Sequence, residues 1–172
     1  FFFDELFGAD AGAGDLFKAL QGELSAALNG ETVCLYAHGA SGSGKTFTIA
    51  SLLASIAREL ESQAKALARG GRKMEVAAQI IEVNNERLRD LLCQDGQLSG
   101  SDSILRGATL LTVCAESPGG IEASIREAYR LAQARCAAPG SCSNSHVIVT
   151  LFPRVYEVAN GAVQHVGRFS LV

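Results

Sequence analysis

The sequence has no tryptophan, only three prolines and no CxxC pair among its five cysteines. Zinc sites and disulfide frameworks need patterned cysteines, so we expect reduced thiols in a cytosolic protein. The net charge of -3 argues against a strongly basic binder of nucleic acid. No apolar run approaches the roughly 20 residues of a membrane span, and the opening FFFDELF lacks a basic leader. We therefore expect neither a nucleic-acid partner nor membrane insertion.

The 172 residues suffice for one ordinary domain with a buried core. Apolar spacing and turn signals predict a helix capped by Asp15 and stopped by Asn29-Gly30, a strand at 32–37 and a helix from Lys45 to Gly70. They then predict a strand at 76–83, a helical or turn segment at 85–92 and a loop at 93–108. The last predicted elements are a helix from a Ser117-Pro118 start to Cys136, and strands at 146–152 and 163–172 flanking Asn160-Gly161. This order predicts an α/β fold, a three-layer sandwich whose mixed central sheet ends in an antiparallel pair.

Residues 39–46 read GASGSGKT and match the phosphate-loop pattern GxxxxGK[ST] at each fixed position. The predicted strand before them and helix after them are the context that this motif requires. Lys45 would lie along the terminal phosphates, and the Thr46 hydroxyl would bind Mg²⁺. Backbone amides would face the phosphates from Gly39, Ala40, Ser41, Gly42, Ser43 and Gly44. A glycine-serine linker that happens to contain a lysine is the alternative.

Five segments, in order along the chain, resemble the kinesin motor domain. FFFDELFGAD is similar to "FxFDxVF", and YAHGASGSGKTFTI with the preceding LNGETVC is similar to the family's nucleotide loop and its "DGYNVC" strand. VAAQIIEVNNERLRDLL resembles "SYLEIYNExIxDLL", GSCSNSHVIVTL resembles switch I with its following strand, and GRFSLV resembles the strand before switch II. Residues 1–172 are thus identified as part of a kinesin-like P-loop NTPase motor domain.

The resemblance implies that Gly39 to Thr46 bind ATP or ADP with Mg²⁺ and that microtubules, built of tubulin, are the track. It implies a coiled-coil partner through segments outside residues 1–172, and a location on the cytoplasmic cytoskeleton, with the ciliary axoneme as one alternative. Phe47 falls where kinesins place a ring against the adenine; packing of Phe47 under the sheet is an equal alternative.

The switch I-like segment at 139–146 departs from the family's "NxxSSRSH". Ser143 is retained, and the resemblance assigns it a catalytic role beside Lys45 and a Mg²⁺ ligand role beside Thr46. Cys142 replaces the first serine, and Asn144 replaces the arginine that pairs with a switch II glutamate in kinesins. Loss of one transition-state hydrogen bond commonly costs about 3 kcal/mol, so these two changes predict slow or absent hydrolysis.

Other departures concern extent. The family's first strand is expected before Phe1, its "GIIPRA" segment is missing after Ala50, and the "DLAGSE" of switch II is expected after Val172, so the chain corresponds to the front half of a motor. Among the remaining residues, Cys34 is expected in the core, and Asp90 is expected on an exposed segment beside Arg87 and Arg89.

Three functions stay open. The first is a microtubule motor that hydrolyses ATP. The second is a structural, non-motile microtubule-associated pseudokinesin, which the altered switch I favours. The third is a small-molecule P-loop kinase, which would need lid arginines and an acceptor pocket that the sequence does not reveal.

Overall fold

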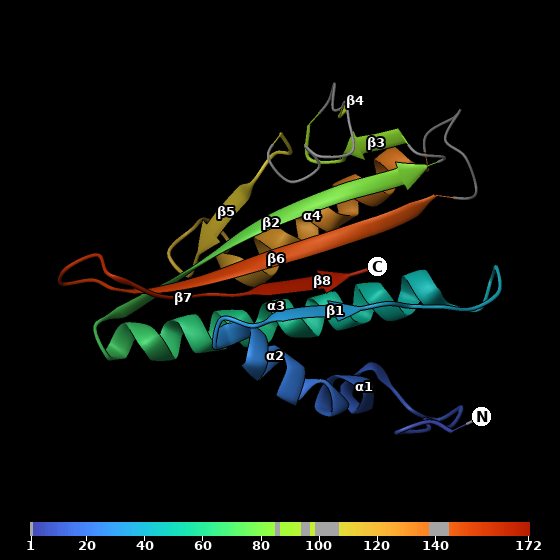
Figure 1. The fold of residues 1–172 in the computed structure, drawn as a ribbon, viewed down its shortest axis with the longest axis horizontal. Helices are drawn as coiled ribbons and strands as arrows, with labels where there is room; N and C mark the ends of the chain where they lie inside the picture. Colours follow the sequence, from blue (N-terminus) through green and yellow to red (C-terminus); the bar gives the residue numbers. More distant parts are fainter. Residues whose placement is uncertain (1, 85–86, 94–96, 99–106, 138–144) are drawn as a thin grey trace.

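The computed structural model describes residues 2–84, 87–93, 97–98, 107–137 and 145–172. In these ranges one mixed sheet is packed against helices (Figure 1). The elements in chain order are α1 (Ala13–Ala19), α2 (Gln21–Leu28), β1 (Thr32–Leu35), α3 (Lys45–Arg69), β2 (Arg72–Asn84), β3 (Arg87–Asp90), β4 (Gln97–Leu98), β5 (Leu111–Cys114), α4 (Gly120–Cys136), β6 (His146–Glu157), β7 (Val163–Val166) and β8 (Arg168–Leu171).

The sheet runs in the order β1-β8-β6-β2-β3-β4, with β5 also paired to β2 and β7 to β6. β1 lies parallel to β8, whereas β6 lies antiparallel to β2, β7 and β8. The long β2–β6 pair extends from Arg72 opposite Glu157 to Val83 opposite His146. The mixed sheet and the turn at Asn160-Gly161 are therefore confirmed. The strand predicted at 163–172 is instead two strands, β7 and β8, and the antiparallel β6–β8 pair lies inside the described sheet and not at its end.

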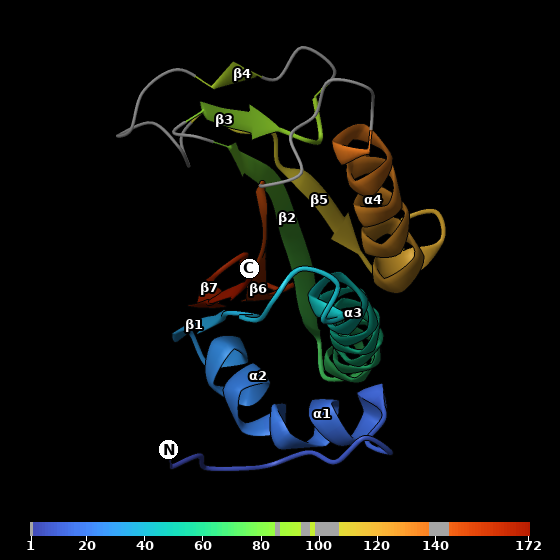
Figure 2. The ribbon, with the colours of Figure 1, turned by 90° about the vertical axis from the view of Figure 1, so that its right-hand side faces the viewer.

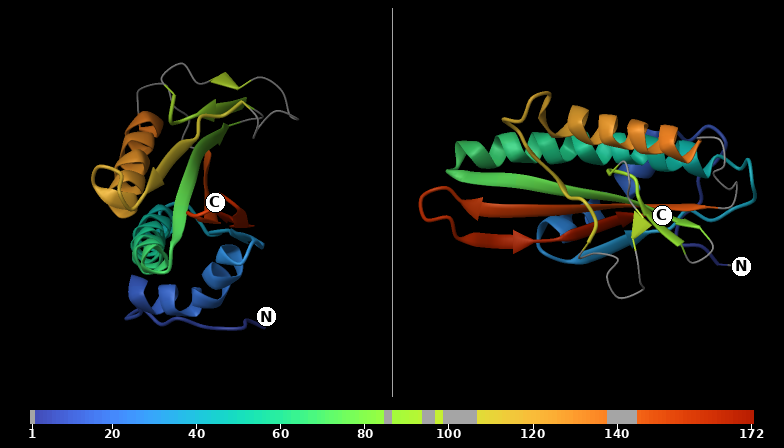
Figure 3. Two further views of the ribbon diagram at one scale, coloured as in Figure 1. Left: turned by 90° about the vertical axis from the view of Figure 1, so that its left-hand side faces the viewer. Right: turned by 90° about the horizontal axis from the view of Figure 1, so that it is seen from above.

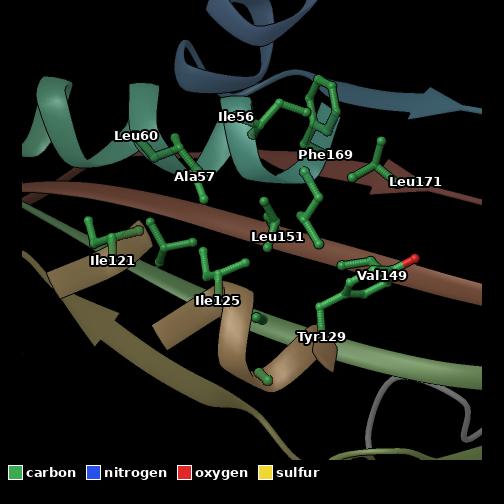
Figure 4. Close-up of a cluster of buried hydrophobic side chains, with 14 of the residues drawn as sticks. Ile56, Ala57, Leu60, Ile121, Ile125, Tyr129, Val149, Leu151, Phe169 and Leu171 are labelled. Atoms are coloured by element: carbon green, nitrogen blue, oxygen red, sulfur yellow. The ribbon is translucent and has the colours of Figure 1, made fainter. Parts of the chain in front are cut away.

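The core lies between one sheet face and the two long helices (Figure 4). α3 and α4 lie side by side along this face (Figures 2 and 3). The apolar positions predicted for α3 are buried, since Leu53, Ile56 and Leu60 are at most 2% exposed. From the sheet, Phe169, Leu151 and Ile80 are equally buried. No helix in the described part of the chain is both long and apolar enough to cross a membrane.

The first predicted helix is two helices in the structure. α1 already starts at Ala13, and the Asp15 carboxylate accepts a hydrogen bond from the Gly12 amide at 3.0 Å, so Asp15 caps from inside the first turn. The helical path breaks at Leu20. α1 contacts α3, whereas α2 contacts β1 and β8. The break at Leu20 lets the chain change direction between α3, which α1 contacts, and the strands β1 and β8, which α2 contacts.

Three short strands were not predicted: β3, β5 and β4, of which β4 lies in the segment expected to be a loop at 93–108 and pairs with β3. The segment at 85–92 was expected to be helical or a turn, but its described part contains β3, with Leu88 opposite Val83. β5 pairs with the other half of β2, placing Val113 opposite Val76. β3 and β5 have only four residues each, so their own sequences carry little strand pattern. They form because the edge of β2 that faces away from β6 supplies their hydrogen-bond partners.

Two burial predictions were wrong. Cys34 is exposed, because β1 turns Val33 and Leu35 toward the helices and Cys34 outward. Asp90 is only 3% exposed, and its carboxylate accepts hydrogen bonds from the amides of Leu92 at 2.9 Å and Thr109 at 2.6 Å. Asp90 therefore holds two segments that are 17 residues apart in the sequence, at Leu92 and at Thr109, instead of pairing with neighbouring arginines.

α4 begins at Gly120, two residues later than the start predicted at Pro118. The Ser117 hydroxyl accepts a hydrogen bond from the Cys114 amide at 3.0 Å, and the cap comes from α3: the Glu61 carboxylate accepts from the Glu122 amide at 2.9 Å. Gly120 has φ +74°, and a Cβ there would lie 2.7 Å from Glu61 Oε2. The Lys65 ammonium, 2.5 Å from Glu61, and the Glu122 amide lower the pKa of the Glu61 carboxyl.

We predict that Glu61→Gln lowers the unfolding free energy by about 1 kcal/mol at pH 7, the usual worth of a helix cap. Because the pKa of Glu61 is lower in the folded state, the difference from wild type is full above the ordinary value of 4.5 and vanishes as pH falls through the folded-state pKa. Urea unfolding of the full chain at pH 7, and at a pH below the folded-state pKa of Glu61, measures this difference in unfolding free energy. Glu59→Gln, on the same helix, is the control, because Glu59 bonds the Gln63 amide and caps none of the described helices. An equal loss of stability at pH 7 in the two variants would contradict the cap.

Candidate phosphate-binding site

The loop of residues 39–46 connects β1 to α3, as the sequence predicted. α3 starts at Lys45, with Gly44 as its N-cap, and its first backbone bond runs from the Thr48 amide to the Gly44 carbonyl at 2.9 Å. The loop lies at the end of the sheet where β2 finishes and β6 starts (Figures 1 and 2). The loop therefore occupies one end of the sheet, at the N-terminus of a 25-residue helix.

The loop backbone needs glycine at two positions. Gly42 has φ +78° and Gly44 has φ +92°, in the left-handed region where other L-residues are strained by roughly 1–2 kcal/mol. At Gly39 an added Cβ would lie 2.7 Å from the Ser43 Oγ. At Gly42 and Gly44 a Cβ would meet no atom within 4 Å, so these two glycines border open space.

The helix end offers unpaired donors to that open space. Among the described contacts, no hydrogen bond engages the backbone amides of Gly44, Lys45 and Thr46. Residues 41–44 and Thr46 are exposed. Free amides at a helix N-terminus carry a partial positive charge, and together they form a site for an anion such as phosphate.

Lys45 closes the loop. Its ammonium donates hydrogen bonds to the carbonyl oxygens of Gly39 at 2.9 Å and Ala40 at 2.7 Å. The charge thus stays beside the free amides while it is held only by two neutral oxygens. Such an ammonium can transfer to phosphate oxygens, which are stronger partners because they are charged.

The same loop fits Mg²⁺ in company with a phosphate. The described residues contain no cluster of three His, Cys, Asp or Glu that could hold a metal alone. Mg²⁺ in nucleotide sites commonly takes one or two protein oxygens, with phosphates and waters as the other ligands. The exposed Thr46 hydroxyl can supply one protein oxygen at this place.

Aromatic side chains lie in the open around the loop. Phe47, in the first turn of α3, is 76% exposed, so the alternative that it packs under the sheet is wrong. Tyr36 is 61% exposed and stacks on His38, with ring centroids 6.4 Å apart. The sequence reasoning missed this pair. The signal was the strand alternation, which puts residues 34, 36 and 38 on the outward side.

The switch I-like segment is only partly described. Cys142, Ser143 and Asn144 lie outside the described residues, so the roles predicted for them stay predictions. Ser145 is half-buried, and His146 is exposed at the start of β6. This start lies at the same end of the sheet as the phosphate loop (Figure 1).

Comparison with known proteins identifies the family. A family model described as microtubule binding matches residues 1–92. Kinesin-like protein klpA of Emericella nidulans is 33% identical over 164 residues, which cover 88% of this chain and 21% of klpA. The chain belongs to the kinesin family. Kinesin-like protein KIN-14N of Oryza sativa subsp. japonica is 31% identical over 189 residues, covering 96% of this chain and 24% of that kinesin.

A solved kinesin motor domain has the same fold. The motor domain of the Kar3-like kinesin from Ashbya gossypii superposes with a TM-score of 0.75 at 19% identity, covering 98% of this chain and 53% of that one. The predicted P-loop α/β fold of a kinesin motor domain is thereby confirmed. This kinesin chain spans about a quarter or less of the two curated relatives and about half of the solved motor domain.

The exposure of Phe47 gives a stability prediction. Phe47→Ala should change the unfolding free energy of the chain by no more than about 0.5 kcal/mol, as is usual for surface positions. Phe169→Ala is the matched comparison: Phe169 is 1% exposed, and its truncation should cost about 3–5 kcal/mol. Urea unfolding measures both. A loss at Phe47 as large as that at Phe169 would restore the packing alternative.

Proposed function

We propose that this kinesin-family chain binds ATP or ADP with Mg²⁺ at residues 39–46 and works on microtubules. The observation that carries the nucleotide proposal is the set of unpaired amides at the start of α3, in front of open space and beside the Lys45 ammonium. The microtubule proposal is supported by the microtubule-binding family model and the kinesin-like relatives.

Each loop residue has a distinct task in this proposal. The amides of the loop hold the phosphates, and the Lys45 ammonium leaves the Gly39 and Ala40 carbonyls to lie along the terminal phosphate oxygens. The Thr46 hydroxyl and Ser143 are assigned to Mg²⁺, and the exposed Phe47 ring to the adenine. Bound Mg²⁺-ATP supplies the phosphoryl group whose hydrolysis drives movement in a motor.

We further propose that hydrolysis is slow. Asn144 cannot supply the positive charge that the kinesin resemblance expects there, and the Cys142 thiol is a weak hydrogen-bond partner. The same two residues favour a second candidate function, a microtubule-associated protein that holds its partner without stepping. Directed movement of single molecules of the full-length protein along microtubules would exclude this static role.

Lys45→Ala tests the nucleotide site. We expect the affinity for fluorescent ADP with Mg²⁺ to fall at least about tenfold, because a charge-assisted hydrogen bond contributes roughly 1.5–3 kcal/mol. Fluorescence anisotropy titration of the full chain measures this affinity. Lys18→Ala removes a lysine that is 76% exposed on α1 and should bind as wild type does. Equal affinities of wild type and Lys45→Ala would defeat the assignment.

The combined variant Cys142→Ser with Asn144→Arg tests the rate proposal. Wild type should release phosphate about a hundredfold or more slowly than an ordinary kinesin in the presence of microtubules, since lost transition-state contacts commonly cost 10²–10³ in rate. The combined variant should be faster than wild type at unchanged ADP affinity. A wild-type rate typical of ordinary kinesins would contradict the proposal.

A further inference from the structure

Two arginines connect the C-terminal end of α4 to β3 and to the residues just after β3, each by donating to backbone carbonyls of the other segment. The Arg89 guanidinium of β3 donates to the Arg135 carbonyl at 3.1 Å. In return, the Arg135 guanidinium of α4 donates to the carbonyls of Leu91 and of Cys93, the latter at 3.3 Å. Arg89 thus bonds a carbonyl of α4, and Arg135 bonds two carbonyls of the residues just after β3. The cation at the helix C-terminus also suits the helix dipole.

A buried carboxylate orients this exchange. Glu82 of β2 is 4% exposed, and its Oε2 lies 2.7 Å from Arg89 Nη2. In the described part of the chain, Glu82 Oε1 and Arg89 Nε are buried without a hydrogen-bond partner. Burial raises the pKa of the adjacent Cys136 thiol, and the Glu82 charge raises it further, against the opposing effect of Arg89. The Glu82 carboxylate is buried, whereas the Arg89 side chain is 39% exposed, and a pair that buries one charge is a poor means of adding stability alone, so another use is indicated.

The location suggests that use. The end of α4, the start of β6 and the phosphate loop lie at the same end of the sheet (Figures 1 and 2). The two arginines join α4 to β3 and to the residues just after it. Glu82, on the neighbouring strand β2, contacts Arg89 at this junction. A helix end fixed by the sheet offers a constant starting point for the residues that follow it toward Ser143 in the sequence.

We propose that Glu82, Arg89 and Arg135 form a positioning group, the arginine clamp, which holds the end of α4 and thereby supports Mg²⁺-dependent nucleotide affinity at residues 39–46. This inference rests on the proposed nucleotide binding. A helix end that is already ordered does not have to be ordered when the nucleotide binds, so the conformational cost of binding is smaller. The clamp touches no phosphate, so its effect is indirect.

Arg89→Lys and Arg135→Lys test the clamp while keeping the charge, because a lysine cannot reproduce the planar fork of donors. Arg130→Lys is the matched control, since Arg130 lies on the same helix and bonds only the exposed Glu127. The first readout is hydrogen exchange of residues 130–137 in the full chain without nucleotide. Exchange should be faster in both clamp variants and unchanged in the control.

The second readout is the affinity for fluorescent ADP, with Mg²⁺ and with EDTA. Affinity with Mg²⁺ should fall about fivefold or more in the clamp variants, while affinity in EDTA stays within about twofold. Glu82→Gln, which keeps the side-chain shape, should move the same way and serves if an arginine variant fails to fold. Wild-type exchange in the clamp variants, or equal losses in Mg²⁺ and EDTA, would overturn the inference alone. A wild type that binds no nucleotide would overturn the proposed function, and this inference with it.

Discussion

The antiparallel pairing of β2 with β6 is the contact on which the other parts of the structure depend. It runs from Arg72 to Val83 and turns Val76, Ala78 and Ile80 toward the helices. One side of this pair receives β3 and β5, and the other side receives β8 and then β1. Because the phosphate loop leaves directly from β1, its place relative to α3 follows from a chain of strand registers that starts at β2 and β6.

α4 shows how this scaffold fixes a helix through both of its ends. At its start the donor amide of Glu122 is bonded by Glu61 of α3, and at its finish the carbonyl of Arg135 is bonded by Arg89 of β3. Between these ends Ile121 and Ile125 are buried against the core (Figure 4). The apolar stripe selects which face of α4 is inward, and the two charged contacts limit sliding of the helix along its axis.

Sequence patterns predicted those parts whose cause is local. The spacing of Leu53, Ile56 and Leu60 predicted α3, the glycines and Lys45 predicted the strand-to-helix loop, and Asn160-Gly161 predicted the hairpin. The features that were not predicted depend on residues far away in the sequence. The α4 cap comes from Glu61, and β3 and β5 exist because β2 has a free edge. Neither cause is visible in the residues near the element itself, and no pattern around Arg89 or Arg135 indicates their exchange of carbonyls.

β1 is the outermost strand on its side of the described sheet, with β8 as its single neighbour and Tyr36 exposed just beyond it. Just past β8, the Val172 amide donates to the Leu35 carbonyl, and the Ala37 amide donates to the Val172 carbonyl, two residues before Gly39. The loop therefore follows a strand that the described sheet holds through β8. Because the connection from this last bond to Gly39 is so short, a displacement of β8 would be passed to the start of the phosphate loop.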